Sequence, residues 1–147
     1  MSAELPNHLL AADGVSFSYG HGKTVLHDVS LGVSAGHSLG LVGESGAGKT
    51  SLLRLLLGLA APTEGSVRFD GQPLRHSDRG AMREFRRAVQ PVYQDPFSSL
   101  DPRMKVGDSI AEPLRSLGVT RDAGACKARV AELLRAVALA GEAATRY

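Results

Sequence analysis

The pattern of hydrophobic positions changes along this chain from a strand period to a helix period. Apolar and polar residues alternate over residues 9–19 and 25–33, which predicts two strands. A continuous apolar run over residues 37–42 predicts a buried strand, and residues 50–59 are apolar on nearly all sides, as in a core helix. Residues 66–69 predict a further short strand, because an Asp-Gly turn signal follows them. The chain is therefore expected to be mostly β up to residue 42, then α/β, and finally all-α.

Helical patterns dominate the second half. A basic helix is expected to run through Arg87, with Ser77 or Asp78 as its N-cap. Apolar residues then recur at helical spacing in two further segments, residues 106–117 and 127–138. Both segments are amphipathic, and packing against each other is the expected role of their apolar faces.

A strand is also predicted over residues 88–93, between the basic helix and the last two helices. Pro91 interrupts it, because proline cannot donate a hydrogen bond to a sheet ladder. Either this strand lies at a sheet edge or its pairing breaks at residue 91. The segment 95–102 that follows contains two Asp-Pro steps, which predict a loop.

Composition narrows the class of protein. Hydrophobic residues make up 43% and charged residues 22% of the 147 residues, as in a soluble globular domain. The net charge of +2 is too small to indicate a nucleic-acid partner, and the arginines near Arg83 are expected to be solvated. The single cysteine, Cys126, rules out an intrachain disulfide and fits a reducing compartment. The longest apolar stretch, residues 55–61, is far shorter than the ~20 residues that span a bilayer.

The segment Gly43-Glu-Ser-Gly-Ala-Gly-Lys-Thr50 matches the phosphate-binding pattern G-x-x-x-x-G-K-[ST]. Its glycines allow several backbone N–H groups to point at one centre, which suits an anion of high charge density. Lys49 supplies a charge for the β- and γ-phosphates, and the Thr50 hydroxyl is placed to coordinate Mg²⁺. A strand before the loop and a helix after it would put the phosphates at a helix N-terminus. The motif predicts nucleotide binding.

The loop alone is compatible with kinases, GTPases and many ATPases, and three further motifs narrow the choice. Phe17-Ser-Tyr-Gly20 precedes the loop, Leu26-His-Asp-Val-Ser-Leu31 lies between, and Val92-Tyr-Gln-Asp-Pro96 follows. Together these motifs resemble the first part of an ABC transporter ATP-binding domain. The longer string from Tyr93 to Arg103 is similar to the dipeptide, oligopeptide and nickel import branch of that family. No Asn-Lys-x-Asp motif for reading guanine is present, which argues against a GTPase.

The resemblance implies an α/β fold: a P-loop NTPase core with an N-terminal antiparallel β subdomain and the start of a helical subdomain. Residues 1–36 and 62–75 would form the β subdomain, residues 37–61 and 88–95 the P-loop core, and residues 96–147 the helical region. The C-terminal part of that core would be missing from these 147 residues. Without the neighbouring strand, the strand before the phosphate loop would expose an apolar edge, so a poorly stable or aggregation-prone chain is expected.

The resemblance also implies the site residues and the cofactors, ATP and Mg²⁺. Tyr19 would stack on adenine, which is worth about 1–3 kcal/mol in comparable contacts. Thr50 and Gln94 would reach the Mg²⁺, and Gln94 would also contact the attacking water. The side chains of Glu44 and Ser45 are expected to fill the turn. The full set of nucleotide-binding residues would be Tyr19, Gly43, Ser45, Gly46, Ala47, Gly48, Lys49, Thr50 and Ser51.

Three motifs of the family are absent from these residues: the Ser-Gly-Gly-Gln signature, an apolar strand ending in Asp-Glu, and the switch histidine. Phosphoryl transfer depends on positioning and charge stabilisation by such groups, so nucleotide binding with little or no turnover is expected. Two alternatives stay open, a non-hydrolysing module that binds nucleotide or a partner, and a soluble ABC-type protein unconnected with transport.

The partners of this chain follow from the resemblance as well. A transporter ATPase subunit would pair with a second ATPase subunit and with transmembrane permease subunits, on the cytoplasmic face of the inner membrane. An extracytoplasmic substrate-binding protein would act with it indirectly. The import of peptides or of nickel would be its role.

Overall fold

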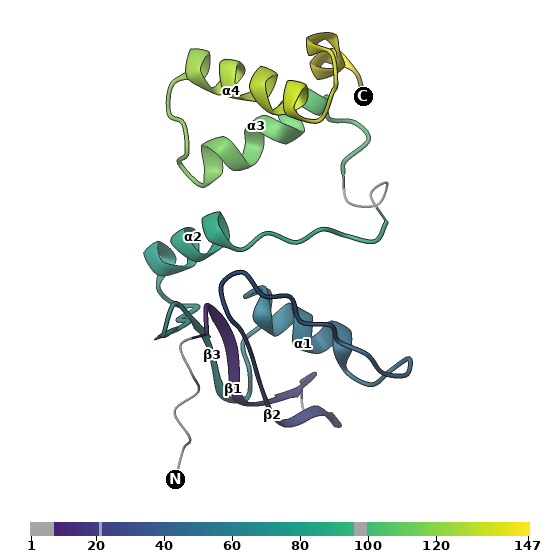
Figure 1. Ribbon diagram of the computed structural model, residues 1–147, viewed down its shortest axis with the longest axis vertical. Coiled ribbons are helices and arrows are strands. Elements are labelled where there is room, and N and C mark those ends of the chain that lie inside the picture. Colours follow the sequence, from purple (N-terminus) through teal and green to yellow (C-terminus); the bar gives the residue numbers. More distant parts are fainter. Residues whose placement is uncertain (1–7, 21, 96–99) are drawn as a thin grey trace. The chain divides into compact units, whose positions relative to one another are not determined.

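The computed structural model describes residues 8–20, 22–95 and 100–147, and it divides into two compact units, residues 1–90 and 91–147 (Figure 1). The first unit contains β1 (Leu10–Ser18), β2 (Thr24–Val33), α1 (Lys49–Leu56), β3 (Glu64–Phe69), β4 (Gln72–Pro73) and α2 (Arg79–Ala88). The second unit contains α3 (Val106–Ser116), α4 (Ala123–Ala136) and the 3₁₀ helix η1 (Gly141–Thr145). Within the described ranges, no helix has the length and apolar character needed to cross a membrane.

The first unit is built on an antiparallel sheet with the strand order β2-β1-β3-β4. Ala12 in β1 lies opposite Leu31 of β2 on one side and Val67 of β3 on the other. Where β3 meets β1, the backbones approach so closely that a Cβ on Gly65 would lie 2.2 Å from the carbonyl oxygen of Gly14. Gly65 also has a φ of +75°, so only glycine fits at this position.

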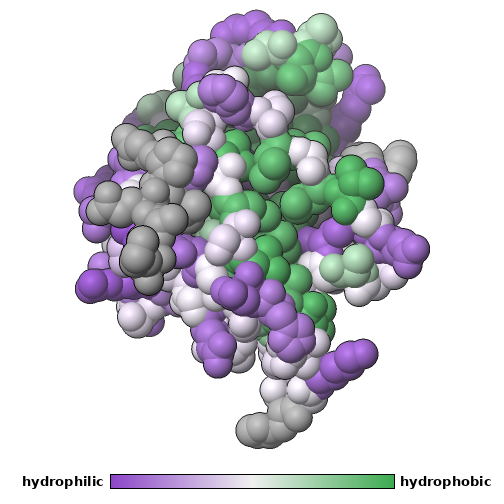
Figure 2. All heavy atoms as spheres, turned by 60° about the horizontal axis from the view of Figure 1, so that its bottom comes forward, coloured by the Kyte–Doolittle hydropathy of each residue, from purple (hydrophilic) through white to green (hydrophobic). Residues whose placement is uncertain are grey.

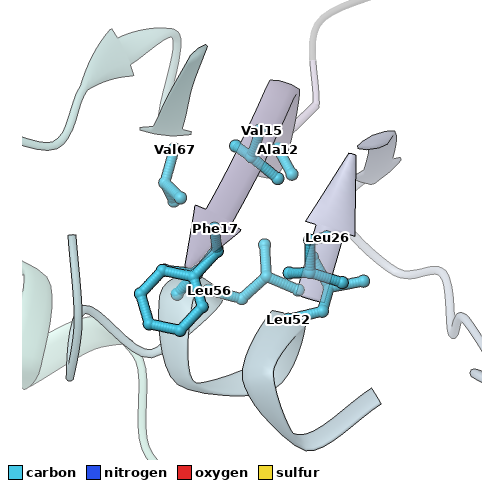
Figure 3. Packing of buried hydrophobic residues seen from close by; sticks show 8 residues of the cluster. Ala12, Val15, Phe17, Leu26, Leu52, Leu56 and Val67 are labelled. Carbon is cyan, nitrogen blue, oxygen red and sulfur yellow. The ribbon is translucent and has the colours of Figure 1, made fainter. Parts of the chain in front are cut away.

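Helix α1 packs on one face of this sheet and closes the main core (Figure 3). The periodicity of α1 places three leucines toward the sheet, Leu52, Leu55 and Leu56. They meet residues from three strands, Ala12, Val15 and Phe17 of β1, Leu26 of β2 and Val67 of β3. This packing fixes the start of α1, and with it the loop of residues 43–48 that precedes the helix.

Helix α2 confirms the predicted basic helix. The Asp78 carboxylate is its N-cap and accepts hydrogen bonds from the N–H groups of Gly80 and Ala81, at 2.9 and 3.0 Å. Met82 and Phe85 are buried, and the Phe85 ring meets the Phe69 ring edge-on at 5.4 Å. The four arginines at positions 79, 83, 86 and 87 are all exposed, as expected of a solvated face.

The second unit is a helical hairpin with a core of its own. Ala111 of α3 packs against Cys126, Val130 and Leu134 of α4, and η1 adds partly buried alanines. The thiol of Cys126 is free, as expected from a single cysteine. Helix α4 begins at Ala123, earlier than the predicted residue 127, because the Asp122 carboxylate accepts a hydrogen bond from Ala125 N at 2.7 Å.

Two predicted strands, over residues 37–42 and 88–93, do not form. Residues 37–44 have no regular structure, and Val42 is 98% exposed. Residue 88 ends α2, residues 89–93 have no regular structure, and Val92 is 99% exposed. A strand needs a neighbour to accept its hydrogen bonds, and neither segment is paired among the described residues. Residues 89–93 are unpaired on both sides of Pro91, so the loss of pairing is not confined to the proline. Figure 2 shows green hydrophobic atoms reaching the surface between purple hydrophilic ones.

Candidate nucleotide site

The phosphate-binding loop turns on two glycines in left-handed conformations. Gly46 and Gly48 have φ angles of +83° and +85°. A Cβ on Gly48 would lie 2.7 Å from Leu26 Cδ2 and 3.3 Å from the carbonyl oxygen of Val25. Gly48 therefore meets both requirements that select glycine, a positive φ and close approach to a neighbouring strand. Gly46 meets only the first, because nothing lies within 4 Å of its Cβ position.

The start of α1 is open to an anion. The first hydrogen bond of the helix runs from Leu52 N to Gly48 O at 2.9 Å, which leaves the N–H groups of the first three helical residues without an intrahelical partner. No side chain of the described chain caps this end, and the first turn holds no acidic residue. The unpaired N–H groups and the helix dipole both favour negative charge here.

A cavity of about 490 Å³ lies at this helix start. It is lined by Val25, Ser45, Gly46, Gly48, Lys49, Thr50 and Ser51. Six of these seven residues belong to the predicted phosphate-binding set, which the structure therefore brings together around one space. No carboxylate is among these lining residues, so none of them repels an anion.

The ammonium group of Lys49 lies against its own loop. Lys49 Nζ donates to the carbonyl oxygens of Gly43 at 2.7 Å and Glu44 at 2.6 Å. Both acceptors are neutral, and phosphate oxygens would form stronger, charge-assisted hydrogen bonds with the same donors. Lysine has three N–H donors, so the group can also turn toward an anion without losing both loop contacts. Lys49 is thus already held beside the cavity that it lines.

Thr50 offers a free hydroxyl for a metal ion. Its side chain is exposed and makes no hydrogen bond to any described residue. Within residues 8–20, 22–95 and 100–147, no cluster of three histidine, cysteine or acidic side chains could hold a metal by itself. These facts fit Mg²⁺, which usually keeps several waters and takes few protein ligands together with phosphate oxygens.

Tyr19 lies beside the cavity rather than in its lining. Its hydroxyl is 3.1 Å from Ser51 Oγ, and its ring meets the Phe17 ring edge-on at 4.9 Å. The side chain is 50% exposed, so part of the ring surface is accessible to a ligand. The sequence does not predict the contact with Ser51, because the two residues are 32 positions apart and no sequence pattern links them.

Gln94 belongs to the second unit, whereas the phosphate-binding loop belongs to the first. Its side chain is exposed, and its role toward Mg²⁺ stays a prediction. Part of the loop that follows, residues 96–99, lies outside the described residues. Beyond it, Arg103 donates to the Asp101 carboxylate at 3.0 and 3.1 Å, and these hydrogen bonds lower the pKa of Asp101.

The antiparallel sheet, the glycine loop and the helix after it define the N-terminal part of an α/β P-loop NTPase fold. Two solved structures share this fold. CbiO1 from Clostridium perfringens, part of the transporter complex cbiONQ, aligns with a TM-score of 0.71 at 20% identity, over 95% of this chain and 53% of its own. The ATP-binding cassette MJ0796 bound to ADP and Pi aligns at 0.72 and 23% identity, over 93% and 60%.

The model of the ABC transporter family matches residues 26–147. The chain therefore belongs to the ABC transporter family. Among curated relatives, the nickel import ATP-binding protein NikE of Brucella suis biovar 1 is 47% identical over 124 residues, 84% of this chain and 46% of the relative. NikE of Escherichia coli K12 is 38% identical over 139 residues, 89% and 52% of the two chains. This chain thus spans about half the length of these relatives.

Proposed function

We propose that this chain provides the phosphate- and adenine-binding part of an ATP-binding subunit in an ABC importer. The observation that carries the proposal is the cavity at the start of α1, where N–H groups, Lys49 and three hydroxyl side chains converge with no carboxylate in the lining. Such a site fits the terminal phosphates of Mg·ATP. Family membership supports ATP over other triphosphates.

Each site residue has a distinct role in this proposal. Lys49 neutralises the β- and γ-phosphates, while Thr50 and the phosphate oxygens hold Mg²⁺, whose charge offsets that of the triphosphate. Ser51 lines the same cavity, and its hydroxyl donates a hydrogen bond to a phosphate oxygen. The accessible ring surface of Tyr19 stacks on adenine. The assignment of Gln94 to the Mg²⁺ and the attacking water rests on the family resemblance of its motif.

The names of the relatives support nickel as the import substrate. The curated relatives compared above are nickel import ATP-binding proteins, whereas the string from Tyr93 to Arg103 is similar to both nickel and peptide importers. The partners would be transmembrane permease subunits and a second ATPase subunit, at the cytoplasmic face of the inner membrane. A substrate-binding protein would deliver the cargo on the other side.

Binding without turnover is the expected behaviour of the 147-residue chain. Its sequence contains neither an apolar strand ending in Asp-Glu nor the Ser-Gly-Gly-Gln signature. In-line attack of water on the γ-phosphate needs a positioned base and full charge stabilisation, and these motifs supply such groups in the family.

Isothermal titration calorimetry with Mg·ATP tests the site. The parent chain is expected to bind ATP with a Mg²⁺-dependent affinity, and Lys49→Ala is expected to lower that affinity at least about tenfold. Lys23→Ala removes an exposed lysine outside the cavity and is the matched control, with no expected change. If folded parent chain takes up no ATP in the presence of Mg²⁺, the proposed function is wrong.

A phosphate-release assay tests the second part of the proposal. Parent chain and Lys49→Ala should both release phosphate at background rate. Steady turnover by the parent that disappears in Lys49→Ala would show that these residues hold a complete catalytic set, contrary to the proposal.

A further inference from the structure

The hydroxyl groups of Tyr19 and Ser51 meet at 3.1 Å at the edge of the phosphate cavity. We propose that they form a hydrogen-bond relay in which Tyr19 donates to Ser51 and Ser51 donates to a phosphate oxygen. Tyr19 is then a positioning residue for the triphosphate, in addition to the adenine-stacking role of its ring. This inference rests on the proposed ATP site and deepens it.

The chemistry of the two hydroxyls fixes the direction of the relay. A serine hydroxyl has one donor and two acceptor lone pairs, so Ser51 can donate to one partner while it accepts from another. Without a ligand, either hydroxyl can be the donor. A phosphate oxygen only accepts, so its arrival requires Ser51 to donate to it and leaves Tyr19 as donor to Ser51 Oγ. Hydrogen bonds in such a chain polarise and strengthen one another.

The surroundings hold both members of the relay in place. Ser51 lies in the first turn of α1, is only 6% exposed, and lines the cavity. Tyr19 follows the end of β1, and its ring packs edge-on against the ring of Phe17, which is 9% exposed. The relay therefore links a strand end to a helix start, and it couples the base-binding side of the site to the phosphate-binding side.

Inorganic tripolyphosphate with Mg²⁺ separates this role from stacking, because it has the phosphates of ATP but no base. In calorimetric titrations, Tyr19→Phe keeps the ring and removes only the hydroxyl. The relay predicts that Tyr19→Phe weakens binding of tripolyphosphate and of ATP alike, each by about threefold to tenfold. If tripolyphosphate binds Tyr19→Phe as tightly as the parent chain, the relay does not exist.

A double-mutant cycle with Ser51→Ala tests whether the effect passes through Ser51. In the Ser51→Ala background, Tyr19→Phe should change tripolyphosphate affinity by less than about twofold. An undiminished loss in that background would overturn the relay. Tyr147→Phe removes another tyrosine hydroxyl, on a side chain that is 76% exposed, and should leave both affinities unchanged.

A measurement without a deletion keeps the inference testable if a variant does not fold. Fluorotyrosine can be incorporated into a chain that carries Tyr93→Phe and Tyr147→Phe, so that Tyr19 is its one tyrosine. Fluorination makes the phenol a stronger donor, and tripolyphosphate should then bind more tightly at a pH where the phenol stays protonated. Unchanged or weaker binding would contradict the relay. If the parent chain binds neither ATP nor tripolyphosphate, the ATP site itself is refuted.

Discussion

Replacing Gly48 with alanine should destabilise the first unit more than the same change at Gly46. Both glycines have left-handed backbones, with φ angles of +85° and +83°, so each alanine variant incurs about 1–2 kcal/mol of backbone strain. Only at Gly48 does the added methyl group meet another atom. It would lie 2.7 Å from Leu26 Cδ2, well inside the ~3.5–4.0 Å separation that is optimal between carbon atoms.

The surroundings of Leu26 set the size of the difference. Leu26 is 5% exposed and packs in the core with Leu52 and Phe17, so its side chain cannot move aside freely (Figure 3). Overpacking of this kind costs about 1–3 kcal/mol. Gly48→Ala should therefore lower the free energy of unfolding by about 2–5 kcal/mol, and Gly46→Ala by about 1–2 kcal/mol.

Thermal unfolding followed by far-ultraviolet circular dichroism, without nucleotide, measures this difference. Each kcal/mol shifts the midpoint by about 4–8 °C in a unit of this size, so Gly48→Ala should melt at least about 4 °C below Gly46→Ala. Nucleotide is left out because both variants disturb the loop N–H groups and would lose affinity. Equal midpoints for the two variants would show that the close approach of the loop to β2 is not present in solution.

Three further predictions concern other parts of the chain. Gly65→Ala places a Cβ within 2.2 Å of a β1 carbonyl oxygen, whereas the Cβ of Gly71→Ala meets nothing within 4 Å. Gly65→Ala should therefore lower the unfolding midpoint in the same assay far more than Gly71→Ala. Similar midpoints would refute the close approach of β1 and β3. Asp78→Ala removes the α2 cap and should lower the free energy of unfolding in urea by about 1 kcal/mol, and no change would argue against the cap. In NMR titration of the carboxyl carbon, the pKa of Asp101 should lie below its usual value and should rise part of the way toward it in Arg103→Ala, because the backbone N–H of residue 103 still donates to Asp101. Because the pKa is lowered, this pair stabilises the fold at pH values above the unfolded-state pKa. That contribution to stability is lost as pH falls through the folded-state pKa. A normal pKa of Asp101 in the parent chain would contradict the pair.

The helices could be predicted from the sequence because their signals are local. The N-cap of α2 at Asp78 and the apolar repeat of α3 depend on residues within a few positions of each other. The phosphate-binding loop was recognised for the same reason, since its eight residues specify both the turn and the charge.

The missing strands show where such reasoning stops. The apolar run at residues 37–42 satisfies the pattern of a buried strand, but pairing depends on a neighbour that a local pattern cannot supply. The same limit hid the contact of Tyr19 with Ser51, which arises only because β1 and α1 pack together. Tertiary contacts determine both whether residues 37–42 pair as a strand and whether Tyr19 meets Ser51.

The unpaired stretch before the phosphate-binding loop has a consequence for handling the protein. Leu39, Leu41 and Val42 are between 39% and 98% exposed, and the backbone beside them forms no ladder with any described residue. Such a stretch can accept a strand from a second molecule, which would bury the apolar side chains and satisfy the amides together. The weight-average molar mass measured by light scattering should therefore rise with protein concentration, and a charged residue in place of Val42 should reduce that rise. A monomer that unfolds cooperatively at high concentration would contradict this expectation.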